Sequence, residues 1–145
     1  MLVKKIYKKL KNNFFLATIY ERLFILGISK IIGHISLKFY RVVYSKNFTC
    51  NSGIQCWGSI SVRIQENASI AIGNNCTIVS DNNRAGITVF TKFKLTALFE
   101  SKIIIGNNVS FNGTSISCRT TSITIGNGTI IGPNVIIVDS DFHGL

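Results

Sequence analysis

The sequence of 145 residues lacks the grouped cysteines and histidines of a metal-binding protein. Its four cysteines, Cys50, Cys56, Cys76 and Cys118, include no CxxC pair, and no histidine stands at ligand spacing from another ligand. This argues against a zinc site, and we expect no metal cofactor. Cysteines without a pairing framework are typical of reduced, buried thiols, which favours a reducing compartment, the cytoplasm.

The sequence also lacks a long uncharged run in its N-terminal part. The longest such stretch of residues 1–46 is 12–20, which has nine residues. A helix needs about 20 apolar residues to cross a bilayer, so we expect no transmembrane helix there. A signal peptide is not expected either, because Glu21 and Arg22 interrupt the apolar region.

Acidic residues are scarce, and their scarcity is local. The whole chain carries a net charge of +10. Residues 1–46 hold ten Lys or Arg and one acid, Glu21, which gives 10 − 1 = +9, whereas residues 47–145 hold six against five, which gives +1. The basicity therefore belongs to an N-terminal arm. Since no recognisable nucleic-acid-binding module accompanies it, we expect no nucleic-acid partner.

The basic arm, residues 1–46, also carries large apolar residues at helical spacing, which predicts an amphipathic helix or two consecutive ones. These residues are Ile6, Leu10, Phe14, Ala17, Phe24, Ile28, Ile31, Ile35 and Phe39. Two interpretations follow. Either the arm lies in a membrane interface as a peripheral contact, with the lysine cluster at 4–11 meeting anionic headgroups, or it packs on the rest of the chain and its lysines are only solvated.

From about Ile54 the composition changes, which marks a boundary near residues 46–53 and a second region at 54–145. Charge thins out, and a six-residue pattern appears with Gly and Asn where corners are expected. The matching hexads are 72–77, 105–110, 111–116, 125–130 and 131–136. This period fits neither an amphipathic helix nor an alternating strand, and it predicts an all-β solenoid with coils of about 3 × 6 = 18 residues.

Residues 79–102 do not keep the six-residue period, and we expect them to leave the coil as an excursion. Arg84 and Lys92 lie in this segment. Loops on a rigid scaffold often carry binding contacts, so these cations could meet an anionic substrate group; the alternative is that they are simply solvated.

The repeats resemble a known family. Ile-Gly-Asn-Asn occurs at 72–75 and 105–108, Ile-Gly-Pro-Asn-Val at 131–135 and Asp-Ser-Asp-Phe-His at 139–143. These motifs are similar to those of left-handed parallel β-helix acyltransferases with hexapeptide repeats, above all the branch that O-acetylates sugars in bacterial surface-polysaccharide assembly. The likeness covers roughly residues 54–145. It implies a left-handed coil, an exception to the usual hand of parallel crossovers.

The resemblance also implies a reaction, the transfer of an acetyl group from acetyl-CoA to a hydroxyl of a sugar or glycan acceptor. His143 matches the histidine that acts as general base in this family, a role that suits a neutral imidazole. Asp139 and Asp141 are candidates to orient that imidazole or to contact the sugar. Asn112 matches an acceptor-binding asparagine, although it could instead be a corner residue. Thr120 departs from the family pattern, which has an acid at the corresponding place.

Members of the family continue for several coils beyond the histidine, and those coils form much of the acetyl-CoA site between subunits of a homotrimer. The resemblance therefore implies a chain that keeps the acceptor-side histidine and lacks much of the donor site. A non-catalytic, membrane-associated β-helix or an inactive remnant is the alternative interpretation.

Overall fold

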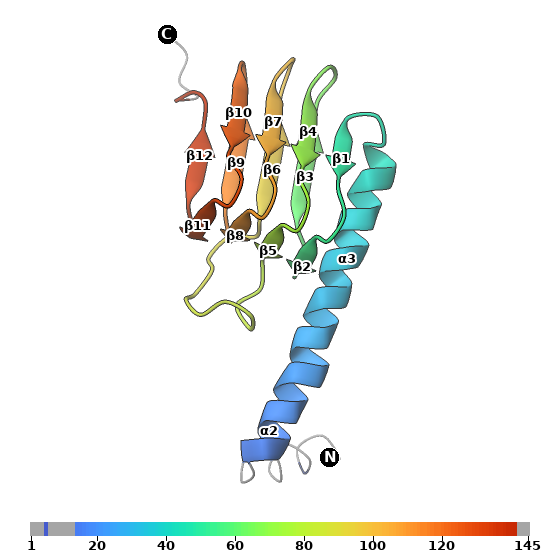
Figure 1. The fold of residues 1–145 in the computed structure, drawn as a ribbon, viewed down its shortest axis with the longest axis vertical. Coiled ribbons are helices and arrows are strands. Elements are labelled where there is room, and N and C mark those ends of the chain that lie inside the picture. The colour runs from blue at the N-terminus through green and yellow to red at the C-terminus, as the bar shows by residue number, and fades with distance from the viewer. Residues whose placement is uncertain (1–4, 6–13, 142–145) are drawn as a thin grey trace.

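The computed structural model describes residue 5 and residues 14–141. A long helical segment is followed by short strands that form three parallel sheets (Figure 1). The helical segment comprises α2 (Phe14–Tyr20), the π-helical turn η1 (Glu21–Ile25) and α3 (Leu26–Val43). The arm is therefore helical over 14–43, as its spacing predicts.

The strands fall into three sheets of four. Sheet A contains β1 (Phe48–Cys50), β4 (Ser69–Ile72), β7 (Lys102–Ile105) and β10 (Ser122–Ile125). Sheet B contains β2 (Gln55–Trp57), β5 (Thr77–Val79), β8 (Ser110–Asn112) and β11 (Ile130–Pro133). Sheet C contains β3 (Ser61–Ile64), β6 (Lys94–Ala97), β9 (Ser115–Cys118) and β12 (Ile136–Val138). The chain passes from A to B to C four times, which is the course of a parallel β-helix.

The coiled region begins earlier than the predicted residue 54. Strand β1 pairs in parallel with β4, with Phe48 opposite Ile70. The sequence before and after β1 lacks the Ile-Gly-Asn motif of the later repeats, but Phe48 and Cys50 alternate inward and are buried. Pairing and burial, and not the repeat pattern, place this segment in the first coil.

The coils are longer than 18 residues, and their sides are unequal. Ile103 of β7 pairs with Ile123 of β10, so these coils are offset by 123 − 103 = 20 residues. Within that coil the inward residues Ile103, Phe111 and Ile116 are 8 and 5 residues apart, and Ile123 follows 7 residues later. The sides of this coil therefore average 20/3, or about 6.7, residues and not the predicted six, because the corners differ in length.

The six-residue step from Ile131 to Ile137 has a local cause. In the preceding coil the equivalent residues, Phe111 and Ile116, are five positions apart. A register shift between Ile131 and Pro133 adds one residue to β11. The regular spacing near the end of the sequence thus results from a bulge.

The core lies inside the coils, where one residue from each sheet meets the others. Ile103, Phe111 and Ile116 are almost completely buried, and the rings of Phe93 and Phe111 pack with centroids 4.9 Å apart. Each buried CH₂ group stabilises the folded state by about 0.8 kcal/mol, so these contacts are the main stabilising contribution to the coils.

The first corner, from sheet A to sheet B, repeats its backbone geometry in every coil. Gly53, Asn75, Asn108 and Gly128 have φ values of +74°, +56°, +58° and +70°. Only glycine and, to a lesser extent, asparagine adopt this left-handed conformation at low cost. The Gly and Asn residues of the hexads 72–77, 105–110 and 125–130 therefore mark this corner, as the sequence predicts. The hexads 111–116 and 131–136 span the second corner, from sheet B to sheet C, where Gly113 and Asn134 have φ values of +57° and +59°.

Asparagine side chains also connect these corners. The backbone N–H of Asn74 donates to Oδ1 of Asn107 at 2.8 Å, and the N–H of Asn107 donates to Oδ1 of Asn127 at 2.7 Å. The ladder satisfies backbone donors that the strands leave open and holds three successive coils in register.

The excursion is shorter than the predicted 79–102. Val79 ends β5, residues 94–97 form β6 and Lys102 begins β7, so only residues 80–93 leave the coil. The six-residue pattern does not reveal residues 94–97, because the loop replaces the corner before them and the corner after them, residues 98–101, contains neither Gly nor Asn. The loop is held on the coil by the side-chain amide of Asn134, which donates to the Thr88 carbonyl at 3.0 Å and accepts from the Phe90 N–H at 2.8 Å.

The helix packs on the first coil through two small residues and one leucine. Ser29, Gly33 and Leu37 are buried against the first coil, mainly at β2 (Figure 1). A Cβ atom on Gly33 would lie 2.2 Å from the carbonyl oxygen of Cys56, so the two backbones are in close contact. Among the described residues, no helix is long and apolar enough to cross a membrane.

Candidate functional site

The third corner, from sheet C back to sheet A, stacks into a row along one edge of the coils. Its turns are residues 65–68, 98–101 and 119–121, and residues 139–141 follow β12. Backbone hydrogen bonds join the levels: the Leu98 N–H donates to the Cys118 carbonyl at 2.9 Å, and the Lys102 N–H to the Thr121 carbonyl at 3.1 Å. Residues that are 20 to 34 positions apart in sequence therefore become neighbours here.

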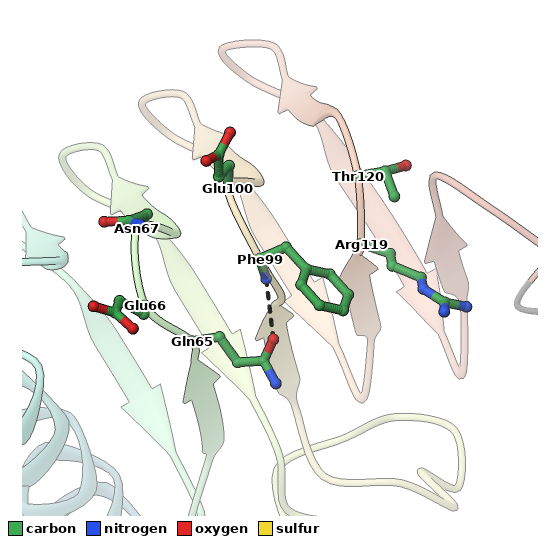
Figure 2. Close-up of a pocket in the computed structure, with 7 residues that line it drawn as sticks. All are labelled: Gln65, Glu66, Asn67, Phe99, Glu100, Arg119 and Thr120. Atoms are coloured by element: carbon green, nitrogen blue, oxygen red, sulfur yellow. Dashed lines mark hydrogen bonds between the residues drawn. The ribbon is translucent and has the colours of Figure 1, made fainter.

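A groove of about 720 Å³ runs along three levels of this edge. Its lining residues are Gln65, Glu66, Asn67, Phe99, Glu100, Arg119 and Thr120, shown in Figure 2. The lining combines one aromatic ring with amides, carboxylates, a guanidinium and a hydroxyl. These groups supply several hydrogen-bond donors and acceptors around one apolar face, the set that a polyhydroxyl ligand such as a sugar requires.

Phe99 is the most unusual residue of the groove. Its φ of +53° lies in the left-handed region, which costs a bulky residue about 1–3 kcal/mol. Burial does not offset this cost, because the side chain is 55% exposed. The Phe99 N–H is held by Oε1 of Gln65 at 3.1 Å, and in Figure 2 the ring lies between Gln65 and Arg119. Strain of this kind at an exposed ring is typical of a binding site.

Asp139 fixes the turn at 119–121. Its Oδ1 accepts a hydrogen bond from the Arg119 N–H at 2.7 Å, and its Oδ2 accepts from the N–H groups of Thr120 and Thr121 at 2.8 and 2.9 Å. Burial raises the pKa of Asp139, but the backbone N–H groups of Thr120, Arg119 and Thr121 outweigh it, and the pKa lies well below its ordinary value. Asp139 is thus an ionised positioning residue for one wall of the groove.

The other predicted residues of this segment are placed only in part. Asp141 is exposed on the same edge as Asp139. His143 lies outside the described residues, so its role as general base stays a prediction. The suggested contacts of Asp139 and Asp141 with the imidazole or the sugar also stay predictions.

Asn112 lies on a different edge. It ends β8 at the second corner, from sheet B to sheet C, which the loop at 80–93 covers through contacts of Val89 with Gly113. Its Oδ1 atom is buried and has no hydrogen-bond partner among the described residues. The structure does not bring Asn112 to the corner that holds Asp139, and its function as an acceptor contact stays a prediction.

The two cations of the excursion have separate surroundings. The guanidinium of Arg84 lies over the ring of Trp57, 5.0 Å from its centroid, and Nζ of Lys30 in α3 is 5.8 Å from the same centroid. Arg84 therefore contributes a cation–π contact between the loop and the first coil. Lys92 is exposed.

The cysteines are free and buried, as the sequence predicts. Burial raises the pKa of the Cys56 thiol to about 12 and that of Cys50 to about 11. Thiols with such raised pKa values are poor nucleophiles at neutral pH. Within residues 14–141, no three His, Cys, Asp or Glu side chains are grouped so that they could hold a metal ion.

Sequence reasoning missed most of the groove, including Gln65, Phe99 and Arg119. A weak signal was present, since these large polar or aromatic residues occupy corner positions where the repeats elsewhere have Gly or Asn. Comparison of the chain with protein-family models, curated proteins and solved structures found no match.

Proposed function

We propose that this chain is a left-handed, hexapeptide-type β-helix that binds a sugar or glycan acceptor in the third-corner groove for O-acetylation. The observation that carries the proposal is the strained, exposed ring of Phe99 among polar side chains, on the edge from which Asp139 and Asp141 lead to His143. The motif Asp-Ser-Asp-Phe-His supplies the general base, and the groove supplies the acceptor contacts.

The charge of the groove supports an acceptor more than a donor. The groove contains two carboxylates, Glu66 and Glu100, and one guanidinium, Arg119. This charge balance suits a neutral, hydroxyl-rich ligand and not the phosphates of acetyl-CoA. Acetyl-CoA would supply the activated acetyl thioester from a separate site, in a homotrimer at the boundary between subunits. None of the groove residues is assigned to that site.

In the proposed reaction, His143 takes the proton of the acceptor hydroxyl while that oxygen forms a bond to the acetyl carbonyl carbon. The carbon–sulfur bond then breaks, and the imidazolium returns the proton to the leaving thiolate. General-base catalysis of this kind contributes about 10²- to 10⁴-fold in rate. The buried thiols take no part, because their raised pKa values leave them protonated.

The test measures transfer of radiolabelled acetyl from acetyl-CoA to a panel of sugars. His143→Ala should lower kcat/KM by about 10²- to 10⁴-fold. The chain contains a matched control: His34, the other histidine, is exposed on α3, and His34→Ala should leave the rate unchanged. Equal rates for wild type and His143→Ala would remove His143 from the mechanism.

A second function, a non-catalytic glycan-binding β-helix, is favoured by the groove alone, since its walls belong to the described residues. It predicts that the chain retains a sugar from the panel without acetyl transfer. Phe99→Ala should weaken that retention at least tenfold through loss of the ring face, with Phe90→Ala, an exposed ring of the loop, as the control. Retention without transfer would select binding over catalysis, and no retention would reject the groove as an acceptor site.

A further inference from the structure

The surface of α3 that faces away from the coils is large and apolar. Its side chains recur at steps of three and four, so they form one stripe along the helix. The apolar stripe consists of Ile28, Ile31, Ile35, Phe39 and Val42, with Ile32 and Val43 beside it. Each of these residues is at least 45% exposed, and Val42 reaches 77%. Contiguous exposure of this kind marks an interaction surface.

A second stripe of basic character runs along one side of the apolar stripe. Lys30, His34, Lys38 and Arg41 follow steps of four, four and three, and all are exposed. The third stripe, Ser29, Gly33 and Leu37, is buried against the coils. The helix thus has a packed side, a cationic side and an exposed apolar side.

The apolar surface continues toward the N-terminus. Helix α2 projects beyond the sheets in Figure 1, and Phe15, Leu23 and Phe24 are 60% or more exposed. Glu21 is the one acid of residues 14–46, against five Lys or Arg. The exposed surface therefore combines large apolar side chains with uncompensated positive charge.

We infer that this helix docks on an anionic lipid surface, with the apolar stripe buried in the headgroup region and the basic stripe at the lipid phosphates. The packed contact with β2 keeps protein on one side of α3, so lipid meets only the opposite side and the helix lies in the plane of the interface. This inference is independent of the groove and of acetyl transfer.

The positive charge of α3 favours an anionic lipid surface over a second copy of the chain as the partner of the apolar stripe. A contact between two copies through the apolar stripe would bring the basic stripes of both helices near one interface with almost no acids to balance them. Anionic headgroups supply that balance, and each Lys or Arg near such a surface strengthens binding about fivefold.

The experiment is flotation of the full chain with vesicles of phosphatidylcholine alone or mixed with phosphatidylglycerol. We expect the chain to float with the mixed vesicles, and high salt to weaken this binding. Ile35→Asp and Phe39→Asp should each reduce binding at least tenfold, since each replaces an inserted apolar side chain by a charge. Lys30→Gln combined with Lys38→Gln should weaken binding to the mixed vesicles about 25-fold.

Two controls keep the result interpretable. Phe90→Asp changes a ring in the loop at 80–93 that is even more exposed than Phe39, and this variant should float like wild type. Trp57, the chain's one tryptophan, has Lys30 of the helix and Arg84 of the loop over its ring, so its fluorescence reports whether α3 remains docked in the Ile35→Asp and Phe39→Asp variants, which leave Lys30 in place.

Three outcomes would overturn the inference. The first is that the wild type floats with neither vesicle type, and the second is that it binds neutral and anionic vesicles equally. The third is that sedimentation shows a dimer that Phe39→Asp dissociates, without any vesicle binding, which would assign the apolar stripe to a second copy of the chain.

Discussion

Isoleucine has opposite surroundings in the two regions of this protein. Ile103 in β7 is 0% exposed at the centre of a coil, whereas Ile35 in α3 is 61% exposed. Most large apolar residues of the first three coils point inward, whereas those of the apolar stripe of α3 point outward. At Gly33 the helix backbone approaches Cys56 too closely for a side chain, so the inner side of α3 near this contact is formed by Gly33 and Ser29. Leu37 is the one large apolar residue of α3 that is buried.

The largest expected effect is a difference in the free energy of unfolding between two phenylalanine variants, one in the coils and one in the helix. Phe111→Ala, in the core, should lower the free energy of unfolding by about 3–5 kcal/mol, because it removes a buried ring and its contact with Phe93. Phe39→Ala, on the apolar stripe, should change it by no more than about 0.5 kcal/mol without lipid. Urea unfolding measures both. Similar losses would mean that the apolar stripe is part of the folded core.

A smaller effect is expected where the two regions meet. Gly33→Ala places a methyl group against the Cys56 carbonyl and should cost about 1–3 kcal/mol, despite the better helix propensity of alanine. Gly27→Ala is the matched control, because nothing lies within 4 Å of its Cβ position; it should stabilise the helix by about 0.5–1 kcal/mol. Thermal unfolding followed by Trp57 fluorescence would show both changes. A neutral Gly33→Ala would contradict the close contact.

The smallest effect concerns the last coil. Asp139→Asn should cost about 1–2 kcal/mol at neutral pH, since the carboxylate accepts several backbone hydrogen bonds. Its pKa is lower in the folded than in the unfolded chain, so this stabilisation is complete above the unfolded value and is lost as the pH falls toward the folded value. The difference in the free energy of unfolding between wild type and Asp139→Asn should therefore become smaller below about pH 4.

Glu100→Gln provides the control for that pH series, because Glu100 is an exposed acid of the same groove. Its unfolding curve should follow that of wild type at each pH. A constant difference between wild type and Asp139→Asn from neutral to acidic pH would show that the charge of Asp139 does not stabilise the turn.

The candidate site was predictable only in part from the sequence. Asp139 and Asp141, the described acids of the motif at 139–143, follow the last strand of sheet C and lie on the edge that holds the groove, but the predicted role of the motif stays untested. Asn112 was grouped with that motif by resemblance, but it ends β8 at another corner. The groove was missed, since Gln65, Phe99 and Arg119 come from three coils and are brought together only by the register of the sheets.

The sequence by itself determined the parallel coils, the Gly and Asn corners, the free thiols and the basic helical arm, because each depends on local composition and spacing. Tertiary structure decided the uneven sides of the coil, the inclusion of β1 and the return of the chain to the coil at residue 94. It also decided which side of α3 is buried. These depend on which backbone segments come into contact, and a close contact such as that of Gly33 with Cys56 joins residues whose separation in sequence follows no repeat.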